Sequence, residues 1–381
     1  MYIVFAAVLA LLLYEFQYIL YKKRWFYGLK TDAFFKVSEA MAGDEATLTE
    51  VIENRKGLPL PMVKVKLQLS RKLEFTETNS AKVSDYFYRT DIYAIGANTK
   101  VTRTINFTCR HRGYYDFHGV DVVGTDLFFS WDFVESVKTS SNLYVYPKPY
   151  SDKIMRPILD RINSDIVNDE NLSKDPFLIK GIREYQPYDT YKDINWKASA
   201  KTEELMVKVH DSTAKKKVRV LLNLENSMIL KKDELNELCI SMAIATLIYF
   251  CKSGSQVSLY ANSRDVLTGE PIKLNEGSSE SHIRNAHRLL ARVDLSKEAI
   301  PVSEFFSEYT KKTNEDVYTI VISPNMQKDF QDMLLKAMDD NLEFNWLCPE
   351  YRDNPFEVHD KLKDRFISVP AEEVLYEISL S

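Results

Sequence analysis

The chain contains few of the residues that make long flexible linkers. Its 381 residues include only 11 glycines and 13 prolines, whereas disordered and linker-rich proteins are enriched in both. Hydrophobic residues make up 45% of the chain, which is enough to build packed cores. We therefore expect folded structure over most of the sequence, with room for two domains and an additional segment.

Cysteine usage and charge exclude further classes of protein. Four cysteines, at positions 109, 239, 251 and 348, form no CxxC pair. We expect neither a zinc site nor a disulfide framework and interpret them as reduced core thiols. The net charge is −5, whereas nucleic-acid-binding domains are usually basic, so no nucleic acid is expected as a partner.

The N-terminal run MYIVFAAVLALLLYEFQYILY, residues 1–21, is apolar and about as long as a bilayer is thick. Glu15 and Gln17 weaken it, because charge in the hydrocarbon layer is unfavourable. Basic residues 22–24 and aromatic residues 25–27 follow. The positive-inside rule predicts a single-pass anchor with the body of the chain in the cytoplasm. A cleaved signal peptide is the alternative, but it would need a basic start and a small-residue cleavage site, and the run has neither.

Residues 35–148 have the pattern of an antiparallel β-sandwich. Short alternating runs are separated by turn residues, and MVKVKLQLS places Val63, Val65, Leu67 and Leu69 on one face. Other predicted strands are Ala46–Asn54, Lys100–Cys109, Tyr114–Gly124 and Asn142–Pro147.

Residues 214–381 alternate strands with helices, which predicts a parallel sheet covered on both faces. The first predicted strand, Val218–Leu224, is almost continuously apolar, as expected for a strand buried on both sides. Ligands in such folds bind at the carboxyl ends of the strands. Neither strand end that we considered, at residues 223–228 and 322–325, has a glycine-rich phosphate loop, so a nucleotide site is unsupported.

The connecting segment, residues 150–213, contains the run GIREYQPYDTYKDINWKASA. This run resembles the signature of the bacterial "domain of unknown function 58" family, and the likeness extends over nearly the whole chain. Tyr188 and Lys192-Asp193 depart from the family pattern. The matching residues are Gly181, Arg183, Tyr185, Asp189, Ile194, Trp196, Ser199 and Ala200.

In that family the C-terminal region is similar to the von Willebrand factor A fold, a Rossmann-like parallel sheet that often holds a divalent cation after its first strand. The resemblance implies a Mg²⁺ site at Asn223, Glu225 and Ser227, but the motif is degenerate. Asn223 replaces an Asp, Glu225 replaces a Ser, and Pro324 stands where an Asp is usual on a later strand. The alternatives are that Glu225 and Ser227 cap the following helix or form hydrogen bonds within their loop, or that they contact a partner without metal.

Three interpretations of the central run stay open. In the first it is a structural clamp, in which Trp196 fills a gap between the sheet and the β domain and Arg183 pairs with Asp189 or Asp193. In the second it is a partner-docking surface, and in the third a catalytic loop. Thr190 and Asp193 also predict a helix over residues 191–201 that begins with a capping box.

Two functions follow from these patterns. The first is a membrane-anchored, non-enzymatic interaction protein, for which the resemblance implies a MoxR-type AAA+ ATPase, or its client, as partner. The second is a hydrolase that uses Asp189, Asp193 and Glu225 as acid and base groups, which requires these carboxylates to converge in one pocket.

Overall fold

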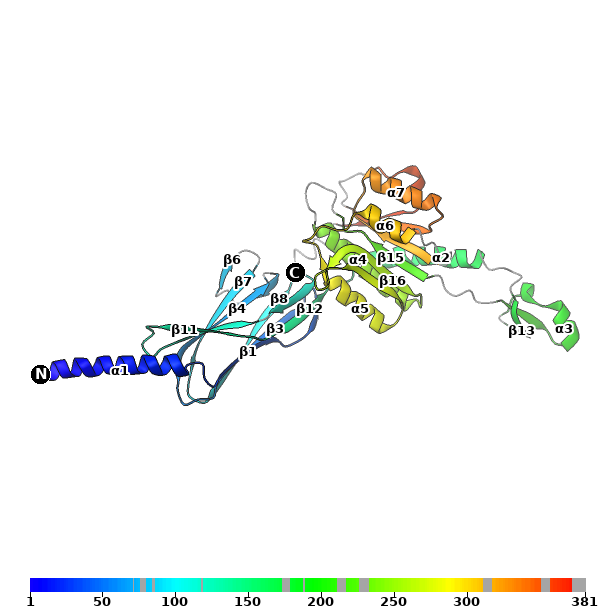
Figure 1. The fold of residues 1–381 in the computed structure, drawn as a ribbon. Helices are drawn as coiled ribbons and strands as arrows, with labels where there is room; N and C mark the ends of the chain where they lie inside the picture. The colour runs from blue at the N-terminus through cyan, green and yellow to red at the C-terminus, as the bar shows by residue number, and fades with distance from the viewer. Residues whose placement is uncertain are drawn as a thin grey trace. The chain divides into compact units, whose positions relative to one another are not determined.

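The computed structural model describes residues 1–70, 72–75, 80–83, 86–117, 119–172, 179–187, 189–210, 217–225, 233–310, 317–350 and 357–371 (Figure 1). These residues form two compact units. One, the β unit, contains Met1–Lys148 together with His287–Val293. The other, the α/β unit, contains Pro149–Ala286 and the chain from Asp294 onward.

The β unit begins with helix α1 (Tyr2–Arg24), which is long and apolar enough to cross a membrane and is largely uncovered by protein. Its C-terminal third is different, because Gln17 and Tyr21 are buried. The Tyr21 hydroxyl donates to the carbonyl of Pro59 at 2.9 Å. A Cβ at Gly124 would lie 2.3 Å from the ring of Trp25, so only glycine lets this ring pack so closely. The predicted anchor therefore continues beyond residue 21 as a helix that packs on the β-sheets.

The β unit is built from two antiparallel sheets and one mixed sheet. The first sheet has the order β1 (Leu29–Phe35), β3 (Glu45–Asn54), β8 (Thr99–Cys109), β5 (Leu73–Phe75). The second has the order β11 (Asp132–Val137), β10 (Val120–Thr125), β4 (Leu60–Ser70), β7 (Tyr86–Ile95), β6 (Ser80–Val83). In the mixed sheet β12 (Ser141–Tyr146) pairs with β2 (Glu39–Met41) in parallel and with β9 (Gly113–Phe117) antiparallel.

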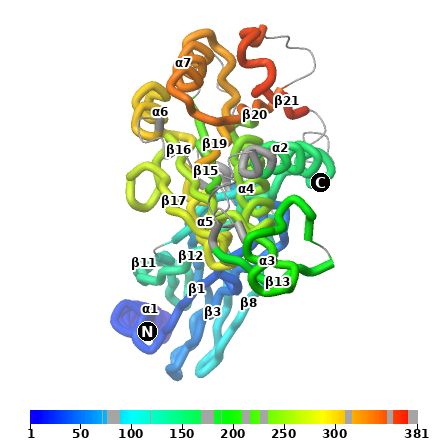
Figure 2. Tube along the Cα trace, turned by 90° about the vertical axis from the view of Figure 1, so that its right-hand side faces the viewer, coloured from blue at the N-terminus to red at the C-terminus, as the bar shows by residue number. Residues whose placement is uncertain are grey.

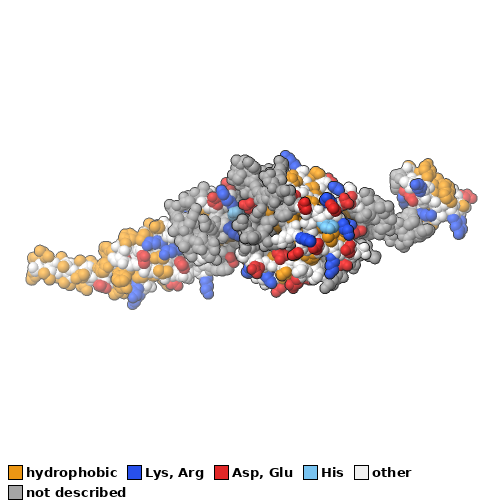
Figure 3. Space-filling view, turned by 90° about the horizontal axis from the view of Figure 1, so that it is seen from above, with side chains coloured by type: hydrophobic (Ala, Val, Ile, Leu, Met, Phe, Trp, Pro, Cys, Tyr) orange, Lys and Arg blue, Asp and Glu red, His pale blue; other side chains and the backbone are white. Residues whose placement is uncertain are grey.

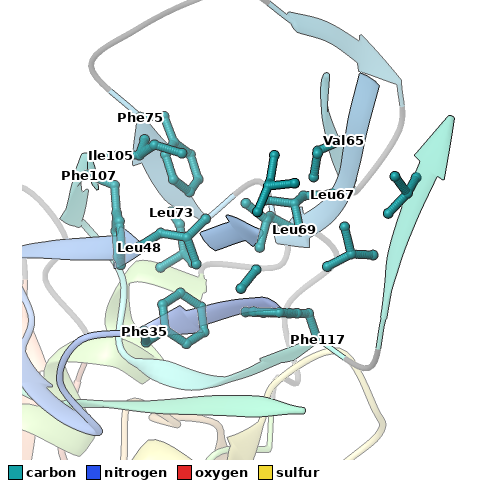
Figure 4. Close-up of a cluster of buried hydrophobic side chains, with 14 of the residues drawn as sticks. Phe35, Leu48, Val65, Leu67, Leu69, Leu73, Phe75, Ile105, Phe107 and Phe117 are labelled. Carbon is teal, nitrogen blue, oxygen red and sulfur yellow. The ribbon is translucent and has the colours of Figure 1, made fainter. Parts of the chain in front are cut away.

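One hydrophobic core joins the sheets of this unit (Figure 4). All four residues predicted to share one face of β4 are buried in it, which confirms that alternation. Phe35 packs edge-on against Phe107 and Phe117, with ring centroids 5.7 and 5.4 Å away. The predicted strand Tyr114–Gly124 is corrected to two strands, β9 and β10, which belong to different sheets.

Strand β7 was not predicted, because charged residues interrupt its alternation. Arg89 and Asp91 are nevertheless buried, and their guanidinium and carboxylate form an ion pair at 2.6 Å. Arg103 adds a second cation at 2.8 Å from Asp91. On the neighbouring sheet Glu50 is also buried and accepts a hydrogen bond from the Tyr93 hydroxyl at 2.5 Å. The core of the β unit thus contains a buried polar cluster in which the charges of Arg89, Arg103 and Asp91 are paired, as buried charges must be. Glu50, in contrast, is bonded to a neutral hydroxyl.

The α/β unit opens with helix α2 (Asp152–Leu172). Strands β15 (Lys217–Leu222), β16 (Val257–Asp265), β19 (Val317–Ile322), β20 (Phe344–Glu350) and β21 (Phe366–Pro370) run parallel. Strand β17 (Pro271–Gly277) is antiparallel at the edge, and the order is β17-β16-β15-β19-β20-β21. The helices are α4 (Asp233–Lys252), α5 (Glu280–Ala291), α6 (Val302–Thr310) and α7 (Lys328–Asp339), and the short elements are η2 (Asp360–Leu362) and β18 (Val293–Asp294).

Helices cover both faces of this sheet, as predicted (Figure 2). Helices α6 and α7 pack with Leu221, Val321 and Trp346 in one core cluster, and α4 contacts the strands from the opposite side. Helix α4 is also apolar enough to cross a membrane, but two thirds of it is buried in this core. All four cysteines are free and buried, which agrees with their interpretation as reduced core thiols. Burial raises the pKa of Cys109 and Cys251 to about 11.

The buried Glu50 predicts an unusual pH dependence of stability. Burial raises its pKa from 4.5 to about 7. An acid whose pKa is higher in the folded state binds more protons when folded, so stability decreases as the pH rises through this interval. We expect the β unit to lose on the order of 2 kcal/mol between pH 5 and pH 8, measured by denaturant unfolding of the full chain in detergent. Glu50→Gln should remove this slope, whereas Glu45→Gln, at an exposed site on the same strand, should keep it; an unchanged slope in Glu50→Gln contradicts the prediction.

Candidate functional site

The central run folds into a small hairpin with two short helical turns, which we call the signature segment (residues 179–210). Strand β13 (Ile179–Glu184) pairs antiparallel with β14 (Met206–His210). Between them lie the 3₁₀ turn η1 (Tyr191–Asp193) and helix α3 (Trp196–Thr202). Ile194 bridges to Val207, and both side chains are buried, so they form the small core of the segment.

An ion pair holds the turn that follows β13. The two terminal nitrogens of Arg183 donate to the two carboxylate oxygens of Asp189 at 2.6 Å each. The backbone amide of Gln186 adds a third bond to Asp189 at 2.8 Å. The hydrogen bond from Arg183 holds the pKa of Asp189 below its usual value. The structure therefore agrees with the Arg183–Asp189 pair proposed from the sequence, and a bidentate pair of this kind fixes orientation as well as charge.

The predicted single helix over residues 191–201 is wrong. Ile194 and its neighbour Asn195 leave the helical conformation, and α3 begins only at Trp196. Asn195 caps it by accepting a bond from the amide of Ala198 at 3.2 Å. Asp193 instead accepts a bond from the Thr190 hydroxyl at 2.5 Å. Tertiary pairing of Ile194 with the hairpin interrupts the helix that local capping residues favoured.

Ser199 connects α3 to the hairpin. Its hydroxyl donates to the carbonyl of Asn195 at 2.9 Å and accepts from the amide of Met206 at 2.9 Å. The amide of Asn195 in turn donates to the carbonyl of Met206 at 2.8 Å. This small hydroxyl side chain therefore satisfies backbone groups on two elements at once, which accounts for its place in the run.

Apolar and aromatic side chains of the same segment face solvent. Tyr191 is 75% exposed and Trp196 is 68% exposed, and Ile182 and Leu205 are also largely uncovered. The ring of Tyr185 stacks on Tyr191 at 6.0 Å. Trp196 is therefore not packed into the small core of its own segment, and the hypothesis that it fills a gap between the sheet and the β domain stays a prediction.

Two other residues of the run add little packing. Ala200 is exposed, and a Cβ at Gly181 would meet nothing within 4 Å. Nothing in the structure explains why glycine stands at position 181. Tyr188 lies outside the described residues.

At the carboxyl edge of the parallel sheet, three neighbouring strands are joined by a chain of side chains, which we call the asparagine ladder (Asn262, Asn223, Ser323). Asn262 donates to the side-chain oxygen of Asn223 at 2.7 Å, and Asn223 donates to the hydroxyl of Ser323 at 2.9 Å. Asn223 is fully buried. The sequence had singled out Asn223 and the strand end at residues 322–325 but missed Asn262, which lies in β16.

The ladder also binds the loops that leave the strands. The side-chain oxygens of Asn262 and Asn223 accept bonds from the amides of Leu224 and Glu225 at 2.7 and 3.1 Å. Ser323 accepts from the amide of Asn325 at 3.1 Å. Each of these buried polar groups is thus matched by a protein partner, as stability requires.

Glu225 caps a helix, but not the one that follows it in sequence. Its carboxylate accepts a bond from the amide of Val302, the first residue of α6, at 2.9 Å. A carboxylate is favoured there by the helix dipole and the free amides. Ser227, the third residue of the predicted cation site, lies outside the described residues.

These contacts do not fit a Mg²⁺ site. The oxygen of Asn223 is already shared by two donors, and its amide nitrogen points to Ser323. Within the part of the chain that the structure describes, no group of three His, Cys, Asp or Glu residues could hold a metal ion. A hard cation needs several oxygen ligands with free lone pairs. Glu225 alone does not supply such a set.

The carboxylates of the hydrolase hypothesis have separate partners. Asp189 is bound by Arg183, Asp193 by Thr190 and Glu225 by the amide of Val302. Each carboxylate thus has a structural hydrogen bond of its own. No described contact joins any two of these three residues to each other.

A family model described as "Protein of unknown function DUF58" matches residues 181–340, so this stretch, from the signature segment into α7, is similar to that family. No curated protein matches the chain. Solved structures with some likeness include a cohesin module of a Clostridium perfringens family 33 glycoside hydrolase, at 12% identity, 30% of this chain, 96% of the other and a TM-score of 0.23. A non-cellulosomal cohesin from Archaeoglobus fulgidus has 16% identity, 30% and 91% coverage and a TM-score of 0.21. These low scores describe faint geometric likeness only.

The ladder predicts that an aspartate at position 223 will not create a cation site. Asn223→Asp removes the donor to Ser323 and places a charge where no solvent reaches, so we expect a destabilisation of about 2–4 kcal/mol. Thermal unfolding of the full chain in detergent, followed by circular dichroism, measures this loss of stability. Asn275→Asp, on an exposed edge position, is the control and should be neutral. A rise in melting temperature of Asn223→Asp on adding Mg²⁺ would show that the loop can still bind the ion.

Proposed function

We propose that this chain is a membrane-anchored, non-enzymatic interaction module that docks a protein partner through its signature segment. The observation that carries the proposal is the contrast within that segment. Bidentate bonding by Arg183 and the shared hydroxyl of Ser199 stiffen the backbone, while Tyr191 and Trp196 are left uncovered. Rigid, exposed aromatic side chains are the usual anchors of protein interfaces, because little conformational entropy is lost when they are buried.

The α/β unit is proposed to be von Willebrand factor A-like. If its strands are numbered along the chain and the two-residue β18 is left out, their order in the sheet is 3-2-1-4-5-6. The third strand, β17, is antiparallel to its neighbour. This is the order of doubly wound nucleotide-binding sheets. The carboxyl edge at β15 and β19, where such sheets bind ligands, is occupied here by the asparagine ladder. A partner would therefore bind by surface contact and not through a shared cation.

The partner we propose is a MoxR-type AAA+ ATPase or its client, on the strength of the family resemblance. The anchor is α1, and the cations Lys22, Lys23 and Arg24 at its C-terminal end favour a cytoplasmic body. In that orientation the signature segment meets the compartment in which ATP-dependent machines act. The proposed orientation of the anchor and the proposed partner therefore agree with each other.

Docking through Trp196 has a direct test. The full chain, purified in nanodiscs, is mixed with the MoxR-type ATPase of the same cell and the affinity is measured with and without Mg²⁺. Trp196→Ala should weaken binding at least about tenfold, as expected for an aromatic anchor. Lys201→Ala, an exposed change on the same helix, should have little effect. Equal affinity of the Trp196→Ala and unchanged chains would contradict docking at this face.

The cytoplasmic orientation predicts protection from external reagents. Because the four native cysteines are buried, a cysteine placed at the exposed Ser38 is the intended target of a membrane-impermeant maleimide. We expect Ser38→Cys to remain unlabelled in intact spheroplasts and to react after lysis. Labelling before lysis would place the body outside and reverse the proposed topology.

A further inference from the structure

The hairpin between β10 and β11 ends in a loop, residues 126–131, that exposes large apolar side chains, and we call it the aromatic loop. Leu127 is 48% exposed, Phe128 58%, Phe129 59% and Trp131 52%. Four large apolar side chains are thus exposed within five positions, residues 127–131. Surfaces that face only water rarely carry such a patch.

The aromatic loop lies along α1 (Figure 1). The ring of Phe128 is 5.8 Å from Tyr14, and the ring of Trp131 is 5.3 Å from Tyr18. Gln17, between these two tyrosines, donates to the carboxylate of Asp126 at 2.8 Å and accepts from the amide of Leu127 at 3.3 Å. Hydrophobic side chains cover α1 and continue onto the domain where the helix joins it (Figure 3).

The level of this contact along α1 is that of a membrane surface. Glu15 is exposed at the height of Tyr14 and Tyr18, and an exposed carboxylate is unfavourable in hydrocarbon. The basic residues 22–24 follow Tyr18 after four to six positions, which is roughly 6–9 Å along a helix. An apolar helix, then a belt of aromatic rings, then cations is the sequence of environments found at a bilayer interface.

The backbone of the loop gives a separate reason to suspect a function. Phe129 has a φ of +58°, a left-handed conformation that glycine or asparagine adopts at lower energy. An exposed phenylalanine in this conformation contributes neither core packing nor a favoured turn. Unfavourable residues of this kind persist where they serve a site.

We infer that the aromatic loop inserts into the headgroup–acyl boundary of the bilayer beside α1, as a second membrane contact of the β unit. The occupant is lipid, because the loop is continuous with the helix proposed to be the anchor and lies at its interfacial level. Insertion of Phe128, Phe129 and Trp131 to about 5–10 Å would be typical of an interfacial element. The inference rests on the proposed anchoring and adds that the domain is held against the membrane and not merely tethered to it.

The test places a fluorophore in the loop of the full chain. Ser130→Cys is exposed and is labelled with an environment-sensitive NBD group, while the native cysteines are buried. The chain is reconstituted in phosphatidylcholine–phosphatidylglycerol vesicles that carry nitroxide quenchers at shallow or deep acyl positions. We expect blue-shifted emission that shallow quenchers reduce more than deep ones. Ser38→Cys, beyond the far end of β1, is the matched control and should stay water-exposed and unquenched.

A second pair of variants separates insertion from folding. Phe129→Asn keeps the left-handed turn, so the fold should be retained and the melting temperature unchanged or higher. Combined with Phe128→Ser in the labelled chain, it should lower the inserted population roughly tenfold per aromatic ring removed. The same chain should still resist carbonate extraction through α1. Persistence of full quenching in this variant would overturn the inference.

Three other outcomes also count against it. A loop label that stays in water while α1 remains inserted overturns the inference and leaves the anchor proposal intact. A chain that is extracted by carbonate refutes the anchor itself. Shielding of the label that lipid quenchers do not affect, and that disappears as the chain is diluted in lipid, means that a second copy covers the loop.

Discussion

A polar group that leaves water must find a partner inside the protein, and this constraint explains the features of the chain that look anomalous in sequence. Gln17 interrupts an apolar helix, but both ends of its amide are bonded by the loop at residues 126 and 127. Arg89 and Asp91 interrupt a strand, but they pair with each other in the core. Asn223 stands where the family resemblance implies a metal-binding carboxylate, and its amide bonds on both sides to neighbouring strands. In each place the cost of burial is offset by specific bonds, and these bonds fix how adjacent elements meet.

The asparagine ladder shows what amides do at this edge that carboxylates could not. A carboxylate only accepts hydrogen bonds, so a row of them across adjacent strands would need a cation to bring them together. An amide both donates and accepts, so Asn262, Asn223 and Ser323 link three strands without an ion. Among the residues predicted to bind Mg²⁺, Glu225 carries the charge. Its carboxylate accepts a hydrogen bond from the amide of Val302. The polar side chains at this edge of the sheet are therefore hydrogen-bonded to one another and to the loops beside them.

Elements with one dominant local signal could be predicted from the sequence. Strand β4 alternates, β15 is a continuous apolar run, and α4 has apolar residues at helical spacing. Each of these patterns indicates one type of element. Strand β7 was missed because its buried cations and carboxylates look like exposed residues until their partners are known. The helix predicted over residues 191–201 is too long, because Thr190 and Asp193 resemble a helix cap. The pairing of Ile194 with Val207, which interrupts it, is a long-range contact that no local pattern reveals. For the same reason Arg183 and Asp189 could be paired in advance, since they lie six residues apart, whereas Glu225 and Val302 could not.

The two exposed apolar surfaces differ in the chemistry around them, and this difference argues for different partners. In the aromatic loop, Phe128 and Trp131 lie beside the rings of α1, a helix that is itself suited to lipid. The uncharged rings have no directional demand, which suits a fluid bilayer. In the signature segment, Tyr191 and Trp196 stand on a backbone that is held by the Arg183–Asp189 salt bridge, the Thr190–Asp193 bond and the Asn195 cap. Lipid gains nothing from such fixed geometry, but a folded partner with a matching pocket does, because rigid anchors lose little entropy on binding. The apolar groups left in water are thus as informative as the polar groups removed from it.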